Sequence, residues 1–441
     1  MNKPIVAIVG RPNVGKSSLF NMMAGENISI IKDTPGVTRD RIYVDVEWLN
    51  KSFTLVDTGG IEPDSDDIIL SQMREQAMIA IDTADVIIFM TDVREGLVEA
   101  DKEVADMLRS SKKPIILCVN KVDNFEKLMN DVYEFYNLGL GDPYPVSARS
   151  KLGIGDMLDE VVSYFNVDVE AGEVDDTPKI ALVGKPNAGK SSIINRLIGE
   201  KRLLVSDIAG TTRDAIDTRV KANKKEYVFI DTAGLRRKSR RKEDLEYYSV
   251  IRAVSAVERA DIAILVIDAA EGVTEQDAKI AGIAHEKGKG IIIAVNKWDL
   301  IEKDNKSTEK FKKDIRLVLP FINYAQIMFI SAKTGQRLIN IYSMVDRILE
   351  NQTMRIQTGV LNEIIAEAVA LNQPPSDKGK RLKIFYGTQV GVKPPTFVLF
   401  VNEKKLFHFS YLRYIENKIR ESFGFEGTSL RFIIRQRKED E

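Results

Sequence analysis

The sequence predicts an α/β chain: two doubly wound domains in tandem, followed by a smaller α+β domain. Through residues 1–166, short apolar runs such as 5–9, 86–90 and 115–119 alternate with longer amphipathic stretches such as 69–81 and 99–109. This alternation is the pattern of a parallel sheet covered by helices. A glycine-rich motif occurs twice, 174 residues apart, and a repeat of this length indicates two whole domains. Residues from 353 onward lack the motif and follow another order of elements.

The repeated motif is a phosphate-binding loop. Residues 10–17 read Gly-Arg-Pro-Asn-Val-Gly-Lys-Ser, between an apolar strand at 5–9 and the start of a helix. In this setting backbone N–H groups and the helix N-terminus surround phosphate oxygens, the lysine reaches the β- and γ-phosphates and the serine hydroxyl binds Mg²⁺. The residues predicted to bind phosphate are Gly10, Asn13, Gly15, Lys16, Ser17 and Ser18, and in the second copy Gly184, Asn187, Gly189, Lys190, Ser191 and Ser192.

Two further motifs supply oxygen ligands and γ-phosphate contacts. Asp57-Thr-Gly-Gly60 ends a predicted strand, so that Asp57 can hold Mg²⁺ through a water and the Gly60 N–H can meet the γ-phosphate. Thr38, between the phosphate loop and a strand hairpin predicted at 44–56, can complete the Mg²⁺ shell. The second copy repeats these positions as Asp231, Gly234 and Thr212.

The base is read by two more motifs. Asp123 of Asn120-Lys-Val-Asp123 can accept hydrogen bonds from both edge donors of guanine, and adenine would leave that carboxylate unpaired. Ser147 and Ala148 can offer backbone N–H groups to the base carbonyl. The residues predicted to bind the base are therefore Asn120, Lys121, Asp123, Ser147 and Ala148, and in the second copy Asn296, Lys297, Asp299, Ser331 and Ala332.

Five motifs in the same order, occurring twice, resemble the Era-like branch of the Ras-like GTPases. The tandem arrangement with a short C-terminal domain resembles the Der (EngA) family of bacterial ribosome-assembly GTPases. This resemblance implies GTP hydrolysis with Mg²⁺ and a role in maturation of the large ribosomal subunit. The expected domains are a first GTPase domain at 1–166, an acidic linker at 167–177, a second GTPase domain at 178–352 and a KH-like domain at 353–441.

Charge is segregated along the chain although the net charge is −1. Residues 1–176 carry −15, whereas residues 177–352 carry +9 and residues 353–441 carry +5. One-sided positive charge is the expected footprint of nucleic-acid binding, so we expect ribosomal RNA as a partner; solvated charge that is unevenly shared is the alternative. The single cysteine, Cys118, lies in an apolar run and excludes a disulfide framework. We expect a cytoplasmic monomer without a membrane span.

The C-terminal domain is predicted as a helix at 359–371, strands at 382–390 and 396–401, a helix at 411–423 and a strand at 430–435. This αββαβ order resembles the KH-like domain that closes Der proteins. Gly424-Phe-Glu-Gly427 has the spelling of the KH clamp, but it follows the second helix and is predicted as a turn. His408 and the neighbouring Phe407 and Phe409 are expected in the core.

In Ras a glutamine orients the attacking water, but this sequence has Ile61 and Leu235 at that position. In potassium-activated members of the Era-like branch, an asparagine in the register of Asn13 and Asn187 helps to coordinate a monovalent cation, so K⁺ is expected here; loop-stabilising hydrogen bonds from these asparagines are the alternative. The predicted catalytic residues are Lys16, Thr38, Gly60, Lys190, Thr212 and Gly234.

Three functions remain open from the residues. The leading one is an RNA-associated assembly GTPase. A GTPase of RNA modification would need an appended chemical domain, which the sequence lacks. A nucleotide-gated scaffold, in which one domain only binds GTP, is compatible with two intact sites.

Overall fold

The computed structural model describes residues 3–25, 43–59, 66–165, 177–199, 204–205, 217–222, 224–230, 244–302, 307–377 and 380–437. Residue contacts divide the chain into two compact units, Met1–Asp176 with Arg241–Glu258 and Thr177–Arg240 with Arg259–Glu441. Among the described residues, no helix is both long and apolar enough to cross a membrane. The three main sheets lie one within each predicted domain, whereas the domain boundaries themselves stay predictions.

The first sheet has six strands in the order β2-β3-β1-β4-β5-β6. Every neighbouring pair is parallel except the hairpin of β2 and β3, which the sequence predicted. The strands are β1 (Ile5–Gly10), β2 (Tyr43–Trp48), β3 (Lys51–Asp57), β4 (Val86–Asp92), β5 (Ile115–Asn120) and β6 (Tyr144–Pro145). Strands β1 and β4 are buried throughout, because continuous apolar runs suit a sheet that is covered on both faces.

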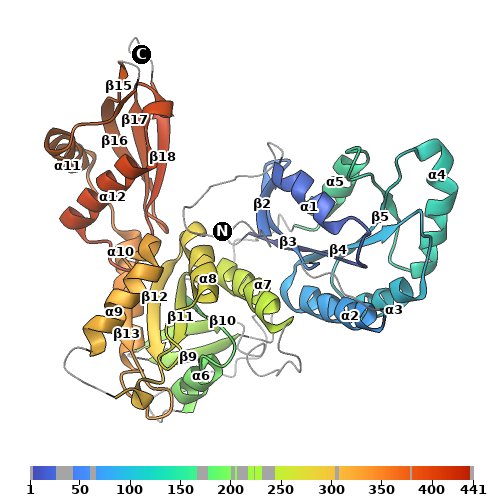
Figure 1. Ribbon diagram of the computed structural model, residues 1–441, viewed down its shortest axis with the longest axis horizontal. Coiled ribbons are helices and arrows are strands. Elements are labelled where there is room, and N and C mark those ends of the chain that lie inside the picture. The colour runs from blue at the N-terminus through green and yellow to red at the C-terminus, as the bar shows by residue number, and fades with distance from the viewer. Residues whose placement is uncertain are drawn as a thin grey trace. The chain divides into compact units, whose positions relative to one another are not determined.

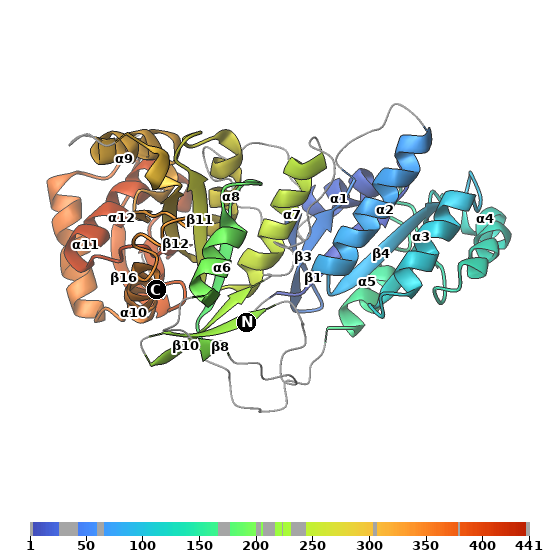
Figure 2. The same cartoon turned by 90° about the horizontal axis from the view of Figure 1, so that it is seen from below.

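Helices cover both faces of this sheet (Figure 1). Helices α1 (Lys16–Gly25) and α5 (Ile154–Ser163) share one core with the strands, through residues such as Leu19 and Leu158. On the other face α2 (Asp66–Thr83) contacts α3 (Glu99–Arg109), and the two lie side by side in Figure 2. Helix α4 (Phe125–Val132) and the 3₁₀ helix η1 (Tyr133–Leu138) follow β5.

The second sheet has seven strands in the order β13-β12-β11-β7-β10-β9-β8. Its strands are β7 (Lys179–Val183), β8 (Leu204–Val205), β9 (Thr218–Ala222), β10 (Lys225–Ile230), β11 (Ile262–Asp268), β12 (Gly290–Asn296) and β13 (Gln326–Phe329). Helices α6 (Lys190–Gly199), α8 (Glu275–Glu286), α9 (Ser307–Val318) and α10 (Asn340–Thr353) accompany it, with 3₁₀ turns η2 (Trp298–Leu300) and η3 (Pro320–Ile322). Helix α7 (Asp244–Arg259) follows β10 in the chain, but its residues as far as Glu258 fall in the first compact unit. Helices α6 and α10 share one apolar core with the strands.

The C-terminal domain has the predicted αββαβ order. Helices α11 (Thr358–Leu371) and α12 (Phe409–Phe423) pack on a three-stranded sheet of β16 (Ile384–Gly391), β17 (Thr396–Val401) and β18 (Arg431–Gln436). A short hairpin, β14 (Ser376–Asp377) with β15 (Lys380–Arg381), and the 3₁₀ turn η4 (Lys404–Leu406) were not predicted. The fold class predicted from the sequence is thereby confirmed.

Two of the three residues expected in this core lie outside it. Phe407 packs against the apolar cluster, but Phe409 is 60% exposed and His408 is also exposed. His408 is the N-cap of α12, and its Nδ1 accepts from the Ser410 N–H at 3.3 Å. The first N–H groups of a helix face solvent, so the side chain that caps them lies at the surface. This explains why His408 is exposed although its neighbours in the sequence are aromatic.

The turn at 424–427 joins the C-terminal domain to the second GTPase domain. Gly427 N–H donates to the Tyr324 carbonyl at 2.8 Å, and the Ile291 N–H donates to the Gly427 carbonyl at 2.8 Å. Arg420 of α12 lies over the Tyr324 ring, 4.3 Å from its centroid. The turn prediction is confirmed, and the segment supports docking between domains.

Candidate nucleotide sites

The first phosphate loop runs from the end of β1 into α1. Lys16 is buried, and its Nζ donates to the carbonyl oxygens of Gly10 at 2.7 Å and Arg11 at 2.6 Å. Burial lowers the pKa of Lys16 to about 8, against the opposing effect of Asp57. The ammonium therefore lies in a poorly hydrated loop, where an anion would find few competing water molecules.

The second loop repeats this geometry. Lys190 Nζ donates to the carbonyl oxygens of Gly184 at 2.6 Å and Lys185 at 2.7 Å. Burial lowers the pKa of Lys190 to about 8 as well. The duplicated sequence thus forms two equivalent lysine positions, each at the carboxyl end of a central parallel strand.

Two of the three magnesium ligands predicted in the first domain, Ser17 and Asp57, lie together. Ser17 Oγ donates to Asp57 Oδ2 at 3.1 Å, and the Gly59 N–H donates to Asp57 Oδ1 at 2.9 Å. A hydroxyl and a carboxylate oxygen so close together fit a hard cation that keeps most of its ligands as phosphates and water. In the second domain Ser191 begins α6 in the same way, whereas Asp231 lies outside the described residues.

One asparagine links the base side of each site to its phosphate loop. Asn120 Nδ2 donates to the Val14 carbonyl at 2.7 Å, and Asn296 Nδ2 donates to the Ala188 carbonyl at 2.9 Å. Gly15 has φ +101°, and a Cβ there would collide with the Asn120 amide. Glycine at this position therefore allows both the left-handed backbone and the close approach of the asparagine.

The predicted carbonyl donors are already engaged. In the first domain the Ala148 N–H donates to Asn120 Oδ1 at 3.0 Å, and the Ser147 N–H donates to the Leu152 carbonyl at 2.9 Å. In the second domain the Ala332 N–H donates to Asn296 Oδ1 at 3.0 Å. A base carbonyl would have to share these donors or replace the present acceptors.

Each carboxylate predicted to select guanine is oriented by a serine. Ser147 Oγ donates to Asp123 Oδ1 at 2.6 Å, and Ser331 Oγ donates to Asp299 Oδ1 at 2.6 Å. Arg94 Nη2 lies 2.5 Å from Asp123 Oδ2. The serine hydrogen bond, more than the arginine, holds the pKa of Asp123 below its usual range, so the carboxylate is kept as an acceptor.

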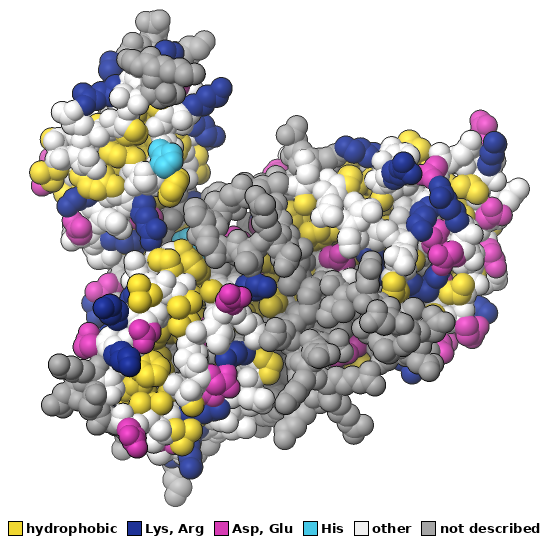
Figure 3. Space-filling view, viewed as in Figure 1, with side chains coloured by type: hydrophobic (Ala, Val, Ile, Leu, Met, Phe, Trp, Pro, Cys, Tyr) yellow, Lys and Arg dark blue, Asp and Glu magenta, His cyan; other side chains and the backbone are white. Residues whose placement is uncertain are grey.

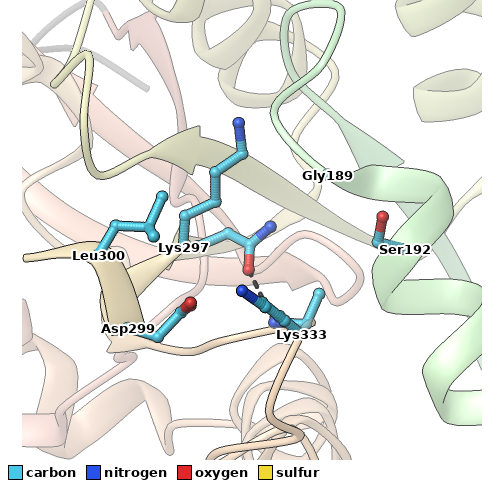
Figure 4. A pocket seen from close by; sticks show the side chains of 8 residues that line it. Gly189, Ser192, Lys297, Asp299, Leu300 and Lys333 are labelled. Carbon is cyan, nitrogen blue, oxygen red and sulfur yellow. Dashed lines mark hydrogen bonds between the residues drawn. The ribbon is translucent and has the colours of Figure 1, made fainter.

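The base motif of the second domain borders a pocket of about 400 Å³. Figure 4 shows Ser192 on α6 across this pocket from Lys297, Asp299 and Leu300. The lining residues are Gly189, Ser192, Asn296, Lys297, Asp299, Leu300, Ala332 and Lys333. Apart from Leu300 and Lys333, all of them were predicted from the sequence as nucleotide-binding residues.

Lys121 and Lys297 of the base motifs each make an ion pair. Lys121 Nζ lies 2.5 Å from Asp92 Oδ2, and Lys297 Nζ lies 2.5 Å from Asp268 Oδ2. The two aspartates end β4 and β11, and sequence reasoning did not single them out. The sequence could have indicated them, because an aspartate occurs at the equivalent position of both copies.

Both asparagines proposed for K⁺ have a left-handed backbone, with φ of 64° at Asn13 and at Asn187. Their side chains are exposed. Five predicted residues lie outside the described part of the chain: Thr38, Gly60, Thr212, Asp231 and Gly234. The same holds for Ile61, Leu235 and the acidic stretch at 166–176.

Comparison with known families gives the same organisation. A family described as "50S ribosome-binding GTPase" matches residues 5–121 and 179–297. The family described as the C-terminal KH-domain-like region of EngA bacterial GTPase enzymes matches residues 355–435.

Individual relatives match along the full length. GTPase Der of Lachnospira eligens is 72% identical over 441 residues and covers 100% of both chains. GTPase Der of Alkaliphilus metalliredigens is 62% identical over 437 residues and covers 99% of both. A solved structure of Era with MgGDPNP and a segment of 16S ribosomal RNA is 22% identical, with 60% of this chain and 94% of that chain covered and a TM-score of 0.30. With tandem phosphate loops, two base motifs and identity of this extent, the chain belongs to the Der (EngA) family and is a GTPase.

Proposed function

We propose that this GTPase is a cytoplasmic assembly factor of the large ribosomal subunit, and that its nucleotide state gates binding to ribosomal RNA. The observation that carries the proposal is the match of both nucleotide domains to a family described by binding to the 50S ribosome. The KH-like match and the positive charge of residues 177–441 point the same way.

The described surface offers a place for RNA phosphates. Exposed cations gather at one end of the C-terminal sheet, where the Asn402 N–H donates to the Lys383 carbonyl at 3.1 Å and the Lys404 N–H donates to Gln436 Oε1 at 3.5 Å. We call this cluster the basic end; its members are Lys380, Arg381, Lys383, Lys404, Lys405 and Arg435. Figure 3 shows Lys and Arg side chains in the upper part of this domain.

Within each site we assign the chemistry to groups of this chain. Lys16 and Lys190 hold the β- and γ-phosphates; Ser17 with Asp57, and Ser191 with Asp231, hold Mg²⁺, which would neutralise charge on the phosphates. Thr38 with Gly60, and Thr212 with Gly234, are assigned to the γ-phosphate. Asp123 and Asp299 select guanine.

We assign K⁺ to Asn13 and Asn187, whose side chains are exposed at the two phosphate loops. Neither carboxamide hydrogen-bonds to another residue within the described part of the chain, so loop-stabilising bonds of these side chains are not seen there. A K⁺ beside the phosphates would supply positive charge where an arginine finger acts in other GTPases.

The ribosomal proposal is tested by binding of the full chain to purified large-subunit particles over a series of salt concentrations. Replacing Lys383, Lys404, Lys405 and Arg435 with glutamine should weaken binding and flatten its dependence on log salt by about 0.7–0.9 per lost phosphate contact. A matched control replaces four exposed lysines of the acidic first domain, Lys102, Lys112, Lys127 and Lys151, and should leave the slope unchanged.

Equal slopes for the two quadruple variants would overturn the assignment of the basic end. Absence of particle binding by the wild type, with GTP or with GDP, would overturn the function itself. Turnover measured separately for Lys16→Ala and Lys190→Ala decides whether one domain only binds GTP, as the scaffold alternative requires.

A further inference from the structure

The two phosphate loops differ in the ion pairs made by their second residue, which is Arg11 in the first domain and Lys185 in the second. In the first domain this residue is Arg11, whose Nε donates to Asp101 Oδ1 at 2.8 Å and whose Nη1 lies 2.5 Å from Glu95. Asp101 is on the first turn of α3 and is fully buried, with 0% of its surface exposed. The guanidinium therefore ties the phosphate loop to the start of α3.

The second domain uses the corresponding carboxylate differently. Asp277, also fully buried, accepts from the Thr274 N–H at 3.0 Å and from Thr274 Oγ1 at 2.8 Å. Thr274 and Asp277 form a capping box at the start of α8. The loop residue there is Lys185, whose ion pair among the described residues is with the exposed Glu271.

The two domains differ at the helix N-cap as well as at the loop residue, which is Arg11 in one and Lys185 in the other. Val98, the N-cap of α3, makes no side-chain cap hydrogen bond, whereas Thr274 at the N-cap of α8 engages the third helical residue. A buried carboxylate needs donors. Without a hydroxyl at Val98, Asp101 takes its donor from Arg11, whose planar guanidinium suits two carboxylates at once.

The ion pair of Arg11 with Asp101 is connected to Lys16 through the backbone of Arg11. The carbonyl oxygen of Arg11 accepts from Lys16 Nζ at 2.6 Å, so the position of Arg11 helps to set where the lysine ammonium lies. Among the described residues, Arg11 Nη2 and Asp101 Oδ2 are buried without hydrogen-bond partners. Removal of either residue would leave further buried charge unpaired.

We propose that Asp101 is a positioning residue of the first nucleotide site: through Arg11 it holds the phosphate loop against α3, whereas Asp277 hydrogen-bonds to its own helix cap and, among the described residues, to no side chain of the second phosphate loop. The inference rests on the nucleotide sites assigned above. It predicts that structural change at α3 alters nucleotide affinity at the first site, whereas the same change at α8 leaves the second site unaffected.

The test measures affinity for a fluorescent GDP analogue in the full chain, with one site disabled at a time by Lys190→Ala or Lys16→Ala. Asp101→Asn should weaken binding at the first site about tenfold, equivalent to about 1.4 kcal/mol. The matched variant Asp277→Asn should lower the thermal unfolding midpoint yet change affinity at the second site less than twofold.

A second variant separates positioning from stability. Val98→Thr supplies the hydroxyl that the second domain has, so Asp101 is drawn into a capping box and away from Arg11. A cap stabilises a helix, so the unfolding midpoint should rise while GDP binding at the first site weakens at least twofold. A purely structural role for Asp101 would move stability and affinity in the same direction.

Unchanged GDP affinity of Val98→Thr and of folded Asp101→Asn would overturn the proposal. An equal loss of affinity in Asp101→Asn and Asp277→Asn at their own sites would also overturn it, because the tie would not be specific to the first domain. Binding that survives the double variant Lys16→Ala with Lys190→Ala would instead refute the nucleotide sites themselves.

Discussion

Ser147 Oγ donates a 2.6 Å hydrogen bond to Asp123 Oδ1, while the other carboxylate oxygen, Oδ2, lies 2.5 Å from Arg94 Nη2. Ser331 makes the same bond to Asp299 at 2.6 Å. The serine thus holds Oδ1 in both sites, and in the first site a base would have to displace Arg94 from Oδ2. This relationship makes the outcome of an isosteric substitution predictable.

Asp123→Asn and Asp299→Asn should each shift the altered site from guanine to xanthine nucleotides. The serine hydroxyl keeps the amide oxygen at the Oδ1 position, so the new NH₂ group replaces Oδ2 and can donate to the C2 carbonyl of xanthine. In a complex with guanine, the same amide NH₂ would face the exocyclic NH₂ group of the base. Two donors would then oppose each other without an acceptor, which costs binding free energy. Binding of GDP and XDP is compared with the other site disabled; unchanged GDP affinity would contradict the assignment.

GDP affinity should fall as pH rises above about 8 at both sites. Burial lowers the pKa of Lys16 and of Lys190 to about 8, so each is protonated below that pH and neutral above it. Bound phosphate favours the charged form and raises the lysine pKa in the complex, so binding above pH 8 takes up a proton and weakens as protons become scarce.

The pH dependence is measured between pH 7 and pH 9 at constant ionic strength, where the loss approaches about tenfold per pH unit above the free pKa. Lys16→Arg and Lys190→Arg serve as matched controls, since a guanidinium stays charged throughout this range. A wild-type profile as flat as that of the arginine variants would refute the lowered lysine pKa values.

GTP turnover should be faster in K⁺ than in Na⁺ at equal ionic strength. Each tenfold of activation corresponds to about 1.4 kcal/mol of transition-state stabilisation. Asn13→Ala and Asn187→Ala should remove the preference at their own sites, but alanine also disfavours the φ of 64° found at both positions. Asn13→Gly and Asn187→Gly keep this backbone accessible while removing the carboxamide.

Equal wild-type rates in the two salts would refute a role for K⁺. A K⁺ preference that persists in the glycine variants would assign the cation to other ligands. Loss of turnover in the alanine variants alone, with the K⁺ preference kept in the glycine variants, would identify the asparagines as backbone-determining residues.

Gly427→Ala should destabilise the second unit more than Gly424→Ala does. Both glycines have positive φ, +73° and +88°, so each alanine loses about 1–2 kcal/mol of backbone energy. A Cβ at Gly427 would also collide with Ile348 of α10, whereas a Cβ at Gly424 meets no atom within 4 Å. The collision adds about 1–3 kcal/mol.

The measurement is urea unfolding of the full chain, followed through the fluorescence of Trp298 in a Trp48→Phe background. Trp298 is buried in the second GTPase domain and reports on its unfolding. Equal destabilisation by the two alanine substitutions would show that the contact between Gly427 and Ile348 contributes nothing to docking.

Much of this protein is determined by its sequence alone. Apolar runs predicted β1, β4 and β5, because a strand buried on both faces must be apolar throughout. The helix at 99–109 was predicted with the bounds of α3. The repeated motifs predicted which residues of the second domain surround its pocket, since each motif ends a strand and parallel strands end at one edge of the sheet.

The tertiary structure alone decided which side chains pair across the fold. Arg11 and Asp101 are 90 residues apart, and Asn120 lies 106 residues from Val14. No periodicity or motif spacing relates such positions. The docking of Gly427 against Tyr324 and Ile348, and the exposure of Phe409, likewise depend on which surfaces the packed domains bring together. Sequence patterns encode local geometry and burial, whereas pairing between distant residues follows from how the elements pack.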